Sequence, residues 1–405
     1  MKGKYLSHKV PRVPNFSHVL LKMFLFFLVL FATPAWSQER KTIEHDLEIW
    51  LIPDKNQIIV EDRITFPDST ISSSDGKFYF FLHAGLNPVS LSDETNIISF
   101  GSKSDNRLFE VLSKSLSSTE SVPQELFGLT FPRGKRTVSI KYQGKIYHPL
   151  KKGGEGYSYV FGGTPGTISF EGVFLSDSSN WYPKFGNELK VFKMIVHLSK
   201  AWDAVSQGKR VEYDQTIEET KVIWECKSPQ EEIFLIGGPF SYYFTTSGRI
   251  KAMVFLRKPS NSLANKYLEV TSRYINMYEG LLGPYPYNKF ALVENFWETG
   301  YGMPSFTLLG PRVIRLPFIL HSSYPHEILH NWFGNGVYVD YEKGNWAEGL
   351  TAYLADHLIK EQQSKSAVYR YGTLQKYTDY VTGQNDFPLI DFQSRHSSST
   401  EAIGY

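Results

Sequence analysis

The chain has 405 residues, enough for about two domains with sizeable hydrophobic cores, and its formal net charge is +2. The near-neutral charge argues against a nucleic-acid partner, since the short basic cluster at residues 133–136 is typical of a solvated hairpin end. Cys226 is the single cysteine, which excludes an internal disulfide and is compatible with an exported protein.

Residues 1–37 have the layout of a secretory signal peptide. Five Lys and Arg residues precede an apolar run at 23–32, and Ala35 and Ser37 put small side chains at the cleavage positions. The run is shorter than the roughly 20 residues of a membrane span, which disfavours the alternative of an uncleaved N-terminal anchor. Signal removal takes away five positive and no negative charges, so the net charge changes from +2 to −3. We therefore predict a secreted or periplasmic protein with no stable membrane span after signal removal.

Residues 38–247 are predicted to form an antiparallel β-sandwich or saddle domain. Apolar and polar residues alternate with a period of two, which is typical of strands that bury one face. This pattern recurs at residues 47–51, 58–66, 138–146 and 189–198. Short strands separated by Gly, Pro and Asp turns favour such a domain, and its many aromatic residues fit core packing better than a sugar-binding surface.

Near Gly248 the pattern changes, and residues 248–405 are predicted to form a second domain. Apolar residues at helical spacing predict a helix over 263–281, and Ser260 and Ser262 are its candidate caps. The later predicted elements are a strand at 290–295, a helical or mixed segment at 369–382 and a polar loop at 394–400.

A His-Glu-x-x-His motif at residues 326–330 is the strongest chemical signal in the chain. Residues four apart lie on one face of a helix, so His326 and His330 can reach a single metal ion. Glu327 then lies beside the metal, where its carboxylate could take a proton from bound water. The residues that suit the start of this helix are Ser322, Ser323 and Pro325.

A second helix is expected to supply the third ligand. Glycines break the chain after the motif, and Asn345 can cap a helix that presents Glu348, eighteen positions after His330. Two histidines and one glutamate leave zinc an open fourth position, which is typical of a catalytic centre. The alternative is that the histidines are core residues of a buried helix, against which the capping residues and the helix break argue.

The motif and its flanks resemble the gluzincin aminopeptidases, peptidase family M1, whose type member is aminopeptidase N. The similar stretches are His-Glu-Ile-Leu-His-Asn-Trp-Phe-Gly-Asn at 326–335 and Trp-Ala-Glu-Gly at 346–349. The family usually has eighteen residues between the second His and the Glu ligand, whereas this chain has seventeen. Residues 170–183 resemble the β domain of the family more loosely, and ordinary sandwich core is the alternative there.

The resemblance implies an α+β multidomain fold, in which an N-terminal β-sandwich or saddle domain precedes a thermolysin-like zinc catalytic domain. It implies one Zn²⁺ ion, held by His326, His330 and Glu348, with Glu327 as the general base. In the family, a tyrosine after the glutamate ligand donates a hydrogen bond to the oxyanion, and Tyr405 falls about where it is expected. A surface tyrosine is the alternative. Because family members continue further, the catalytic domain at 248–405 is expected to be incomplete at its C-terminus.

The resemblance also predicts an edge strand at residues 300–306, where a substrate backbone pairs beside the metal. The predicted substrate-binding residues are Gly302, Met303, Pro304 and Ser305. Pro304 stands where the family usually has the glutamate of Gly-x-Met-Glu-Asn, which grips the α-amine of the substrate. Glu294 and Glu298 lie close upstream and are the candidates to replace it.

The predicted function is an exported zinc metallopeptidase that acts on peptide substrates, as an aminopeptidase on short peptides. One alternative is an endopeptidase-like zinc enzyme without strict recognition of the N-terminal amine, which Pro304 motivates. Another is a non-catalytic binding protein that keeps zinc for stability, against which Glu327 argues. The sequence does not indicate an oligomeric state.

Overall fold

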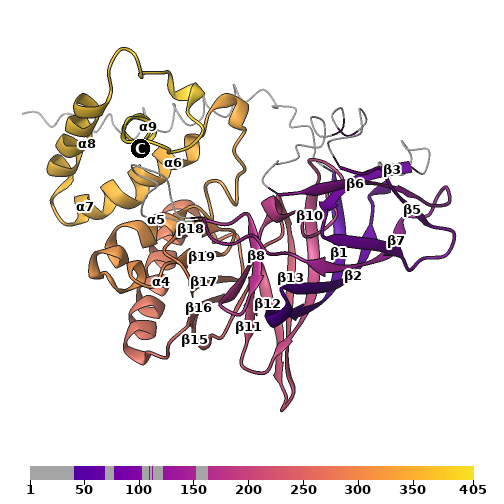
Figure 1. The fold of residues 1–405 in the computed structure, drawn as a ribbon. Coiled ribbons are helices and arrows are strands. Elements are labelled where there is room, and N and C mark those ends of the chain that lie inside the picture. Colours follow the sequence, from indigo (N-terminus) through magenta and orange to yellow (C-terminus); the bar gives the residue numbers. More distant parts are fainter. Residues whose placement is uncertain (1–40, 69–76, 103–108, 110–111, 113–121, 152–162) are drawn as a thin grey trace, which may run out of the picture. The chain divides into compact units, whose positions relative to one another are not determined.

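Figure 1 shows the computed structural model of the chain, coloured along the sequence. It describes residues 41–68, 77–102, 109, 112, 122–151 and 163–405. Residues Lys41–Tyr405 form one compact unit. The predicted signal peptide at 1–37 lies outside the described residues, so export stays a prediction. Within the described ranges, no helix combines the length and apolar character that crossing a bilayer requires.

Three sheets form the described chain before Ser241. The largest has seven strands in the order β12-β13-β10-β1-β2-β7-β4, and the others have the orders β11-β14-β9-β8 and β3-β6-β5. The strands are β1 (Thr42–Ile52), β2 (Gln57–Thr65), β3 (Lys77–His83), β4 (Leu86–Ser90), β5 (Asn96–Ser99), β6 (Gln124–Thr130), β7 (Thr137–Lys145), β8 (Gly166–Ser169), β9 (Gly172–Leu175), β10 (Leu189–Ser199), β11 (Asp203–Val205), β12 (Lys209–Gln215), β13 (Glu219–Gln230) and β14 (Leu235–Gly238).

The predicted alternation of apolar residues builds the seven-stranded sheet. In β1 and β2 alternate side chains are buried, because successive side chains of a strand point to opposite faces. β2 is antiparallel to both β1 and β7. β1 and β10, however, are parallel, with Thr42 opposite Leu189. The prediction of an antiparallel domain is therefore wrong for this pair, since strands joined by a long connection are not held antiparallel by a hairpin.

A fourth sheet of five strands carries the elements around the predicted site, in the order β15-β16-β17-β19-β18. β16, β17 and β19 are parallel, whereas β15 and β18 are antiparallel to their neighbours. The domain boundary predicted after residue 247 falls within the β15–β16 hairpin. The five-stranded sheet begins before that boundary, at Ser241. The strands are β15 (Ser241–Ser247), β16 (Ile250–Leu256), β17 (Lys289–Glu294), β18 (Gly300–Met303) and β19 (Phe306–Leu309).

The five-stranded sheet has two buried faces. Met253 and Phe255 of β16 belong to one hydrophobic core together with the first three sheets. Val254 and Leu256, which point the other way, pack in a second core with the helices α4 and α5. Figure 1 shows the sheet between these two layers. Because both faces of the sheet are packed, the sheet is a rigid support for the predicted site.

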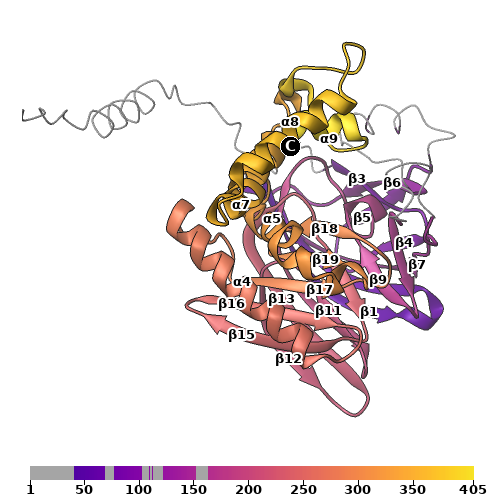
Figure 2. The same cartoon turned by 90° about the vertical axis from the view of Figure 1, so that its left-hand side faces the viewer.

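Helices follow or cover the last sheet. They are α4 (Asn261–Leu282), α5 (Ser323–Leu329), α6 (Trp346–Ala352), the π-helix η8 (Tyr353–His357), α7 (Leu358–Gln362), α8 (Ser366–Tyr380) and α9 (Ser398–Gly404). Short 3-10 helices are η1 (Pro53–Lys55), η4 (Asp177–Ser179), η5 (Val313–Arg315), η6 (Pro317–His321), η7 (Tyr341–Lys343) and η9 (Leu389–Asp391). Figure 2 shows α7, α8 and α9 gathered beyond α5 and β18.

Two helix ends illustrate how local sequence sets structure. Ser260 caps α4 as predicted, since its side chain accepts a hydrogen bond from the Leu263 N–H. The polar loop predicted at 394–400 is partly wrong, because α9 begins at Ser398. Ser397 and Thr400 form a capping box at its start, so these small polar residues begin a helix.

Candidate metal centre

Helix α5 contains His326 and ends at its C-cap residue, His330. The His330 N–H donates to the carbonyl of His326 at 3.1 Å, so helical geometry extends across the motif. The two imidazoles lie on one face, with ring centroids 4.8 Å apart. Ser322 occupies the N-cap position but forms no capping bond, because its hydroxyl donates to the Phe318 carbonyl at 3.0 Å. The capping prediction is wrong in this detail.

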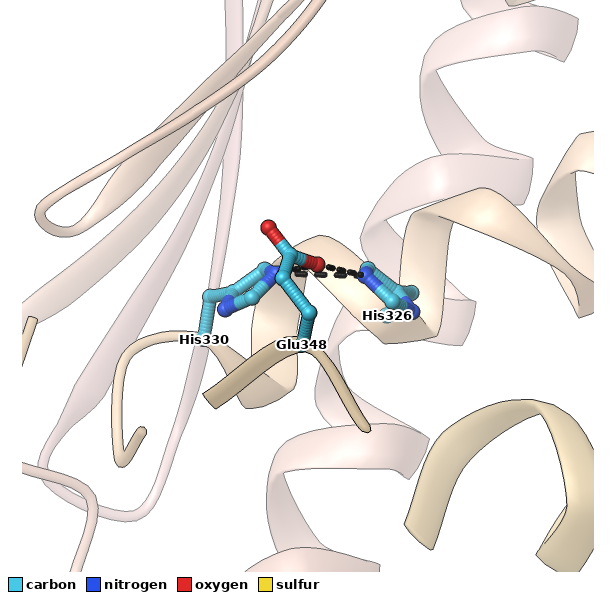
Figure 3. A group of neighbouring side chains, drawn as sticks. All are labelled: His326, His330 and Glu348. Atoms are coloured by element: carbon cyan, nitrogen blue, oxygen red, sulfur yellow. Dashed lines mark hydrogen bonds and ion pairs between the residues drawn. The ribbon is translucent and has the colours of Figure 1, made fainter. Parts of the chain in front are cut away.

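Helix α6 brings Glu348 to these histidines. Asn345 is its N-cap residue, and the Asn345 Oδ1 accepts the Ala347 N–H at 3.2 Å. Glu348 Oε2 lies 3.3 Å from Nε2 of both His326 and His330. Figure 3 shows the three side chains pointing toward one another. The loop between the two helices is one residue shorter than is usual in the M1 family, but the Glu348 carboxylate still reaches the histidines.

The three ligand atoms have the spacing that a tetrahedral metal ion requires. Zinc binds nitrogen and oxygen at about 2.0–2.1 Å, which places two ligands of a tetrahedron about 3.3–3.4 Å apart. Here the two Nε2 atoms are 3.1 Å apart, and each lies 3.3 Å from the carboxylate oxygen. These residues therefore form a group that could hold a metal ion and leave a fourth position open.

The nitrogen that each imidazole turns away from this centre is also bonded. His326 Nδ1 lies 3.0 Å from Asp356 Oδ2, and His330 Nδ1 lies 3.1 Å from the Phe333 carbonyl. Both partners accept, so each Nδ1 carries a proton, and each Nε2 is the nitrogen that can offer a lone pair to a metal ion. Sequence reasoning missed Asp356. Asp356 could have been noticed as an acid eight residues after Glu348 on a continuing helix. The π-helix η8, however, changes which residues share the face of Glu348.

Charge at the centre favours a bound cation. Burial disfavours the charged imidazole of His326, but hydrogen bonds to Asp356 and Glu348 outweigh it and raise its pKa to about 10. Burial likewise disfavours the anionic form of Glu348, yet bonds with His326 and His330 lower its pKa well below its usual value. Two carboxylates thus stabilise positive charge here, as a proton on His326 or as a metal ion that replaces it.

Glu327 and the edge strand β18 meet beside the ligands. A Cβ added to Gly302 would lie 2.1 Å from Glu327 Oε2, so the carboxylate rests directly against the glycine backbone. Gly302 and Glu327 line the same cavity as His326, His330 and Glu348. The predicted general base therefore faces open space between the edge strand and the ligand group.

That cavity has a volume of about 1050 Å³. Gly302, Met303 and Pro304 line it, and their binding of substrate stays a prediction. Titratable groups from distant parts of the chain also reach its wall; they are Asp177, Glu231, Glu232, Lys376 and Arg395. Burial, followed by the charges of Glu231, Glu348 and Glu232, raises the pKa of Tyr341, so these acids lie within electrostatic range of that tyrosine.

Ser305 does not line the cavity, contrary to its prediction as a substrate contact. It is fully buried, with a left-handed backbone at φ 69°. Its N–H donates to Asn331 Oδ1 at 2.6 Å, and its carbonyl and hydroxyl accept from Lys289 Nζ at 3.0 and 2.9 Å. Asn331 Nδ2 in turn donates to the carbonyls of Glu327 and Ile328. Ser305 and Asn331 therefore join the edge strand to the helix of the motif.

The two glutamates considered as replacements at position 304 are occupied elsewhere. Glu294 is 2% exposed, accepts from the Arg257 N–H at 2.8 Å and pairs with Arg315 at 2.6 Å. Glu298 accepts from the Arg312 N–H at 3.0 Å. Neither lines the metal cavity. Neither candidate therefore replaces the missing carboxylate, because both are bonded to Arg257, Arg312 or Arg315 outside that cavity.

Tyr405 lies within the site. Its ring stacks on His326, with centroids 5.9 Å apart and planes 5° from parallel. The cavity is lined by Tyr405, and burial together with the charge and hydrogen bond of Glu348 raises the pKa of its hydroxyl. The tyrosine is therefore a protonated hydrogen-bond donor beside the ligand group, which disfavours the alternative of an unrelated surface residue.

Removing the Asp356 carboxylate is expected to weaken metal binding. In Asp356→Ala the His326 ring loses the acceptor that orients it, so zinc affinity should fall about 10–100-fold. Competition against a chromophoric chelator measures this affinity. Asp379→Ala, at an exposed position of α8, is the matched control and should bind zinc like the unchanged chain. Equal affinities in the two variants would contradict an orienting role.

Comparison with known proteins gives structural neighbours at low sequence identity. No family model matches the chain, and no curated protein matches its sequence. An M1 zinc metallopeptidase mutant from Deinococcus radiodurans, bound to the substrate Tyr-Ser-Ala, matches at 14% identity over 91% of this chain and 80% of its own, with a TM-score of 0.58. The M1 zinc metallopeptidase from Deinococcus radiodurans matches at 15% identity over 88% and 79%, with a TM-score of 0.55.

A third neighbour extends the comparison beyond bacteria. Native yeast LTA4 hydrolase matches at 15% identity over 85% of this chain and 52% of its own length, with a TM-score of 0.57. At such low sequence identities, the likeness is evidence for the fold alone. It confirms that the chain has the fold implied by the resemblance of residues 326–349. The chain therefore has the fold of the M1 zinc metallopeptidases.

Proposed function

We propose that the chain is an exported zinc metallopeptidase that removes residues from the N-terminus of short peptides. The observation that carries the proposal is the Glu327 carboxylate, which faces the cavity between Gly302 and the three ligand atoms. A purely structural metal site has no use for a carboxylate in that place. The fold supports the same reading, and the neighbour bound to Tyr-Ser-Ala supports short peptides as the substrate class.

The edge strand offers a place for the substrate backbone. β18 is the outer strand of its sheet and pairs with β19 alone among the described strands. An extended peptide can add to its other side through backbone hydrogen bonds. Because residue 302 has no side chain, the bound peptide can approach Glu327 closely.

The reaction needs a base, an acid and stabilisation of an oxyanion. Zinc held by His326, His330 and Glu348 would supply a Lewis acid for the peptide carbonyl and for water activation. Glu327 takes the proton of the attacking water on its carboxylate and passes it to the leaving amine. The Tyr405 hydroxyl, which is protonated beside the site, donates to the oxyanion of the tetrahedral intermediate.

Recognition of a free α-amine has to come from outside the edge strand. Position 304 carries proline, and Glu294 and Glu298 are bonded elsewhere. Glu231 and Glu232, which line the cavity and act on Tyr341 together with Glu348, are the nearby acids that support an amine site. They belong to the first three-sheet part of the chain, so this part would contribute to substrate binding.

The second candidate is a zinc peptidase without strict amine recognition. It is favoured by Pro304, which removes both a carboxylate and a backbone N–H from the cavity wall. The non-catalytic alternative, a binding protein stabilised by zinc, leaves the position of Glu327 unexplained.

Glu327→Gln is expected to separate metal binding from catalysis. The amide keeps the size of the side chain but cannot accept the proton, so kcat should fall by about 10²–10⁴-fold. Zinc content, measured by atomic absorption, should stay at one ion per chain. Glu361→Gln, at an exposed position of α7, is the control for the charge change. Full activity of the Glu327→Gln protein would exclude the proposed mechanism.

Gly302→Ala tests whether the edge strand and the base share one space. The new methyl group would lie 2.1 Å from Glu327 Oε2, so the carboxylate must move, and kcat/KM should fall by about 10²-fold. Gly300→Ala is a matched control in the same strand, because nothing lies within 4 Å of its added Cβ. Similar peptide hydrolysis rates for the two variants would show that β18 does not border the reaction.

A peptide and its N-acetylated twin distinguish the two peptidase candidates. Acetylation removes the positive charge of the α-amine, so an aminopeptidase should cleave the blocked peptide at least about tenfold more slowly. Hydrolysis is followed by liquid chromatography with and without a zinc chelator. Equal rates for the two peptides would reject amine recognition and favour the endopeptidase-like candidate, whereas chelator-resistant hydrolysis would reject zinc catalysis.

A further inference from the structure

A second cavity, of about 310 Å³, lies at the carboxyl ends of the parallel strands β16, β17 and β19. None of the residues that line it lines the metal cavity. The residues come from three separate segments that follow these strands: Arg257 and Lys258, then Glu294, Asn295 and Phe296, then Pro311, Arg312 and Arg315. The crevice outside the carboxyl ends of parallel strands is a common place for ligands in open sheets.

Cations outnumber acids in the lining of this crevice. Glu294 is the acid among the lining residues, and both of its oxygens are bonded, to the Arg257 N–H and to Arg315 Nη1. Glu298 stands outside the lining and pairs with Arg312 at 3.4 Å. The charges of Glu294 and Glu171 favour the charged form of Arg257. Glu294 accepts from the backbone N–H of Arg257, however, so among the described residues no ion pair joins the Arg257 guanidinium to an acid as Arg315 and Arg312 are joined.

Arg257 differs from the other cations in having a buried nitrogen without a hydrogen-bond partner in the described part of the chain. Its Nη1 atom is buried and has no hydrogen-bond partner among the described residues. The guanidinium lies over the ring of Phe296, 5.8 Å from its centroid, which holds one face of it against the protein. Burial lowers the pKa of this arginine, so the charged group is held at a cost that a bound anion would offset.

Asn295 is a second unsatisfied group in the same wall. The residue is 1% exposed, its Nδ2 donates to Thr299 Oγ1 at 3.2 Å, and its Oδ1 has no partner. The Thr299 hydroxyl donates to the Leu308 carbonyl at a long 3.4 Å. If the amide is turned over, this hydroxyl can donate to the Asn295 oxygen instead, which pairs that oxygen and frees the NH₂ group as a donor toward the crevice.

We propose that this crevice binds a small oxyanion of the phosphate class, held by Arg257 and Asn295 with Lys258, Arg312 and Arg315 at the rim. A guanidinium offers paired N–H donors that match two oxygens of such an anion. The volume of the crevice is at the small end for ligand pockets, which suits a compact ion or a single phosphate group. The site is separate from the metal centre, so the proposal does not depend on the proposed peptidase function.

The test is calorimetric titration of the full chain with inorganic phosphate, at constant ionic strength balanced with gluconate. Saturable binding is expected, with an affinity that falls at least about tenfold in Arg257→Gln, because the charge-assisted bonds are lost. Arg257→Gln removes no hydrogen bond of the side chain within the described residues, so it should fold, and circular dichroism verifies this. Arg63→Gln, on the exposed face of β2, is the control and should bind like the unchanged chain.

Two further measurements test the proposal independently of the folding of Arg257→Gln. If Arg257→Gln does not fold, the double variant Lys258→Gln and Arg312→Gln, at exposed rim positions, should weaken phosphate binding and reduce its salt dependence. Glycerol phosphate distinguishes a phosphate group on a larger molecule from the free ion. Absence of saturable phosphate binding, or equal affinity in the unchanged chain and the crevice variants, would overturn the proposal.

Discussion

The site depends on the convergence of two imidazole nitrogens and one carboxylate oxygen on a single point. His326 and His330 are adjacent on one helical turn, whereas Glu348 reaches them from a separate helix. At separations of 3.1–3.3 Å, these lone-pair-bearing atoms are stabilised by a positive charge between them, carried by a proton or by a metal ion. The outward bonds to Asp356 and to the Phe333 carbonyl keep the rings in this orientation. The open fourth position, and with it the chemistry proposed for the cavity, follows from that arrangement.

The distance between Glu327 and the edge strand β18 is set by buried contacts below the cavity. Asn331 follows the second histidine and bonds to the Ser305 N–H, while Lys289 holds the other polar atoms of Ser305. These bonds tie the β18–β19 turn to the last turn of α5, so Gly302 rests against Glu327. A fully buried serine in a left-handed conformation is thus explained by positioning rather than by substrate contact.

In the proposed function, catalysis and substrate recognition come from different parts of the fold. The candidate metal ligands, Glu327 and Tyr405 belong to the last sheet and its helices, whereas the likeness to the M1 metallopeptidase fold extends over 91% of the chain. The acids that could meet a substrate amine belong to the first three-sheet part, since position 304 holds proline. A shared hydrophobic core joins the two parts, so a substrate between them would lie against rigid walls.

Short-range patterns were sufficient to predict the ligand group, the helix α4 with its cap, and the alternating strands. Those features depend on helical and strand periodicity over a few residues, which the chain carries locally. The parallel pairing of β1 with β10, the outward partner Asp356, the buried role of Ser305 and the redirected Glu294 could not be predicted in this way. Each depends on strand register or on contacts between segments far apart in the chain, and only the folded structure brings those segments together.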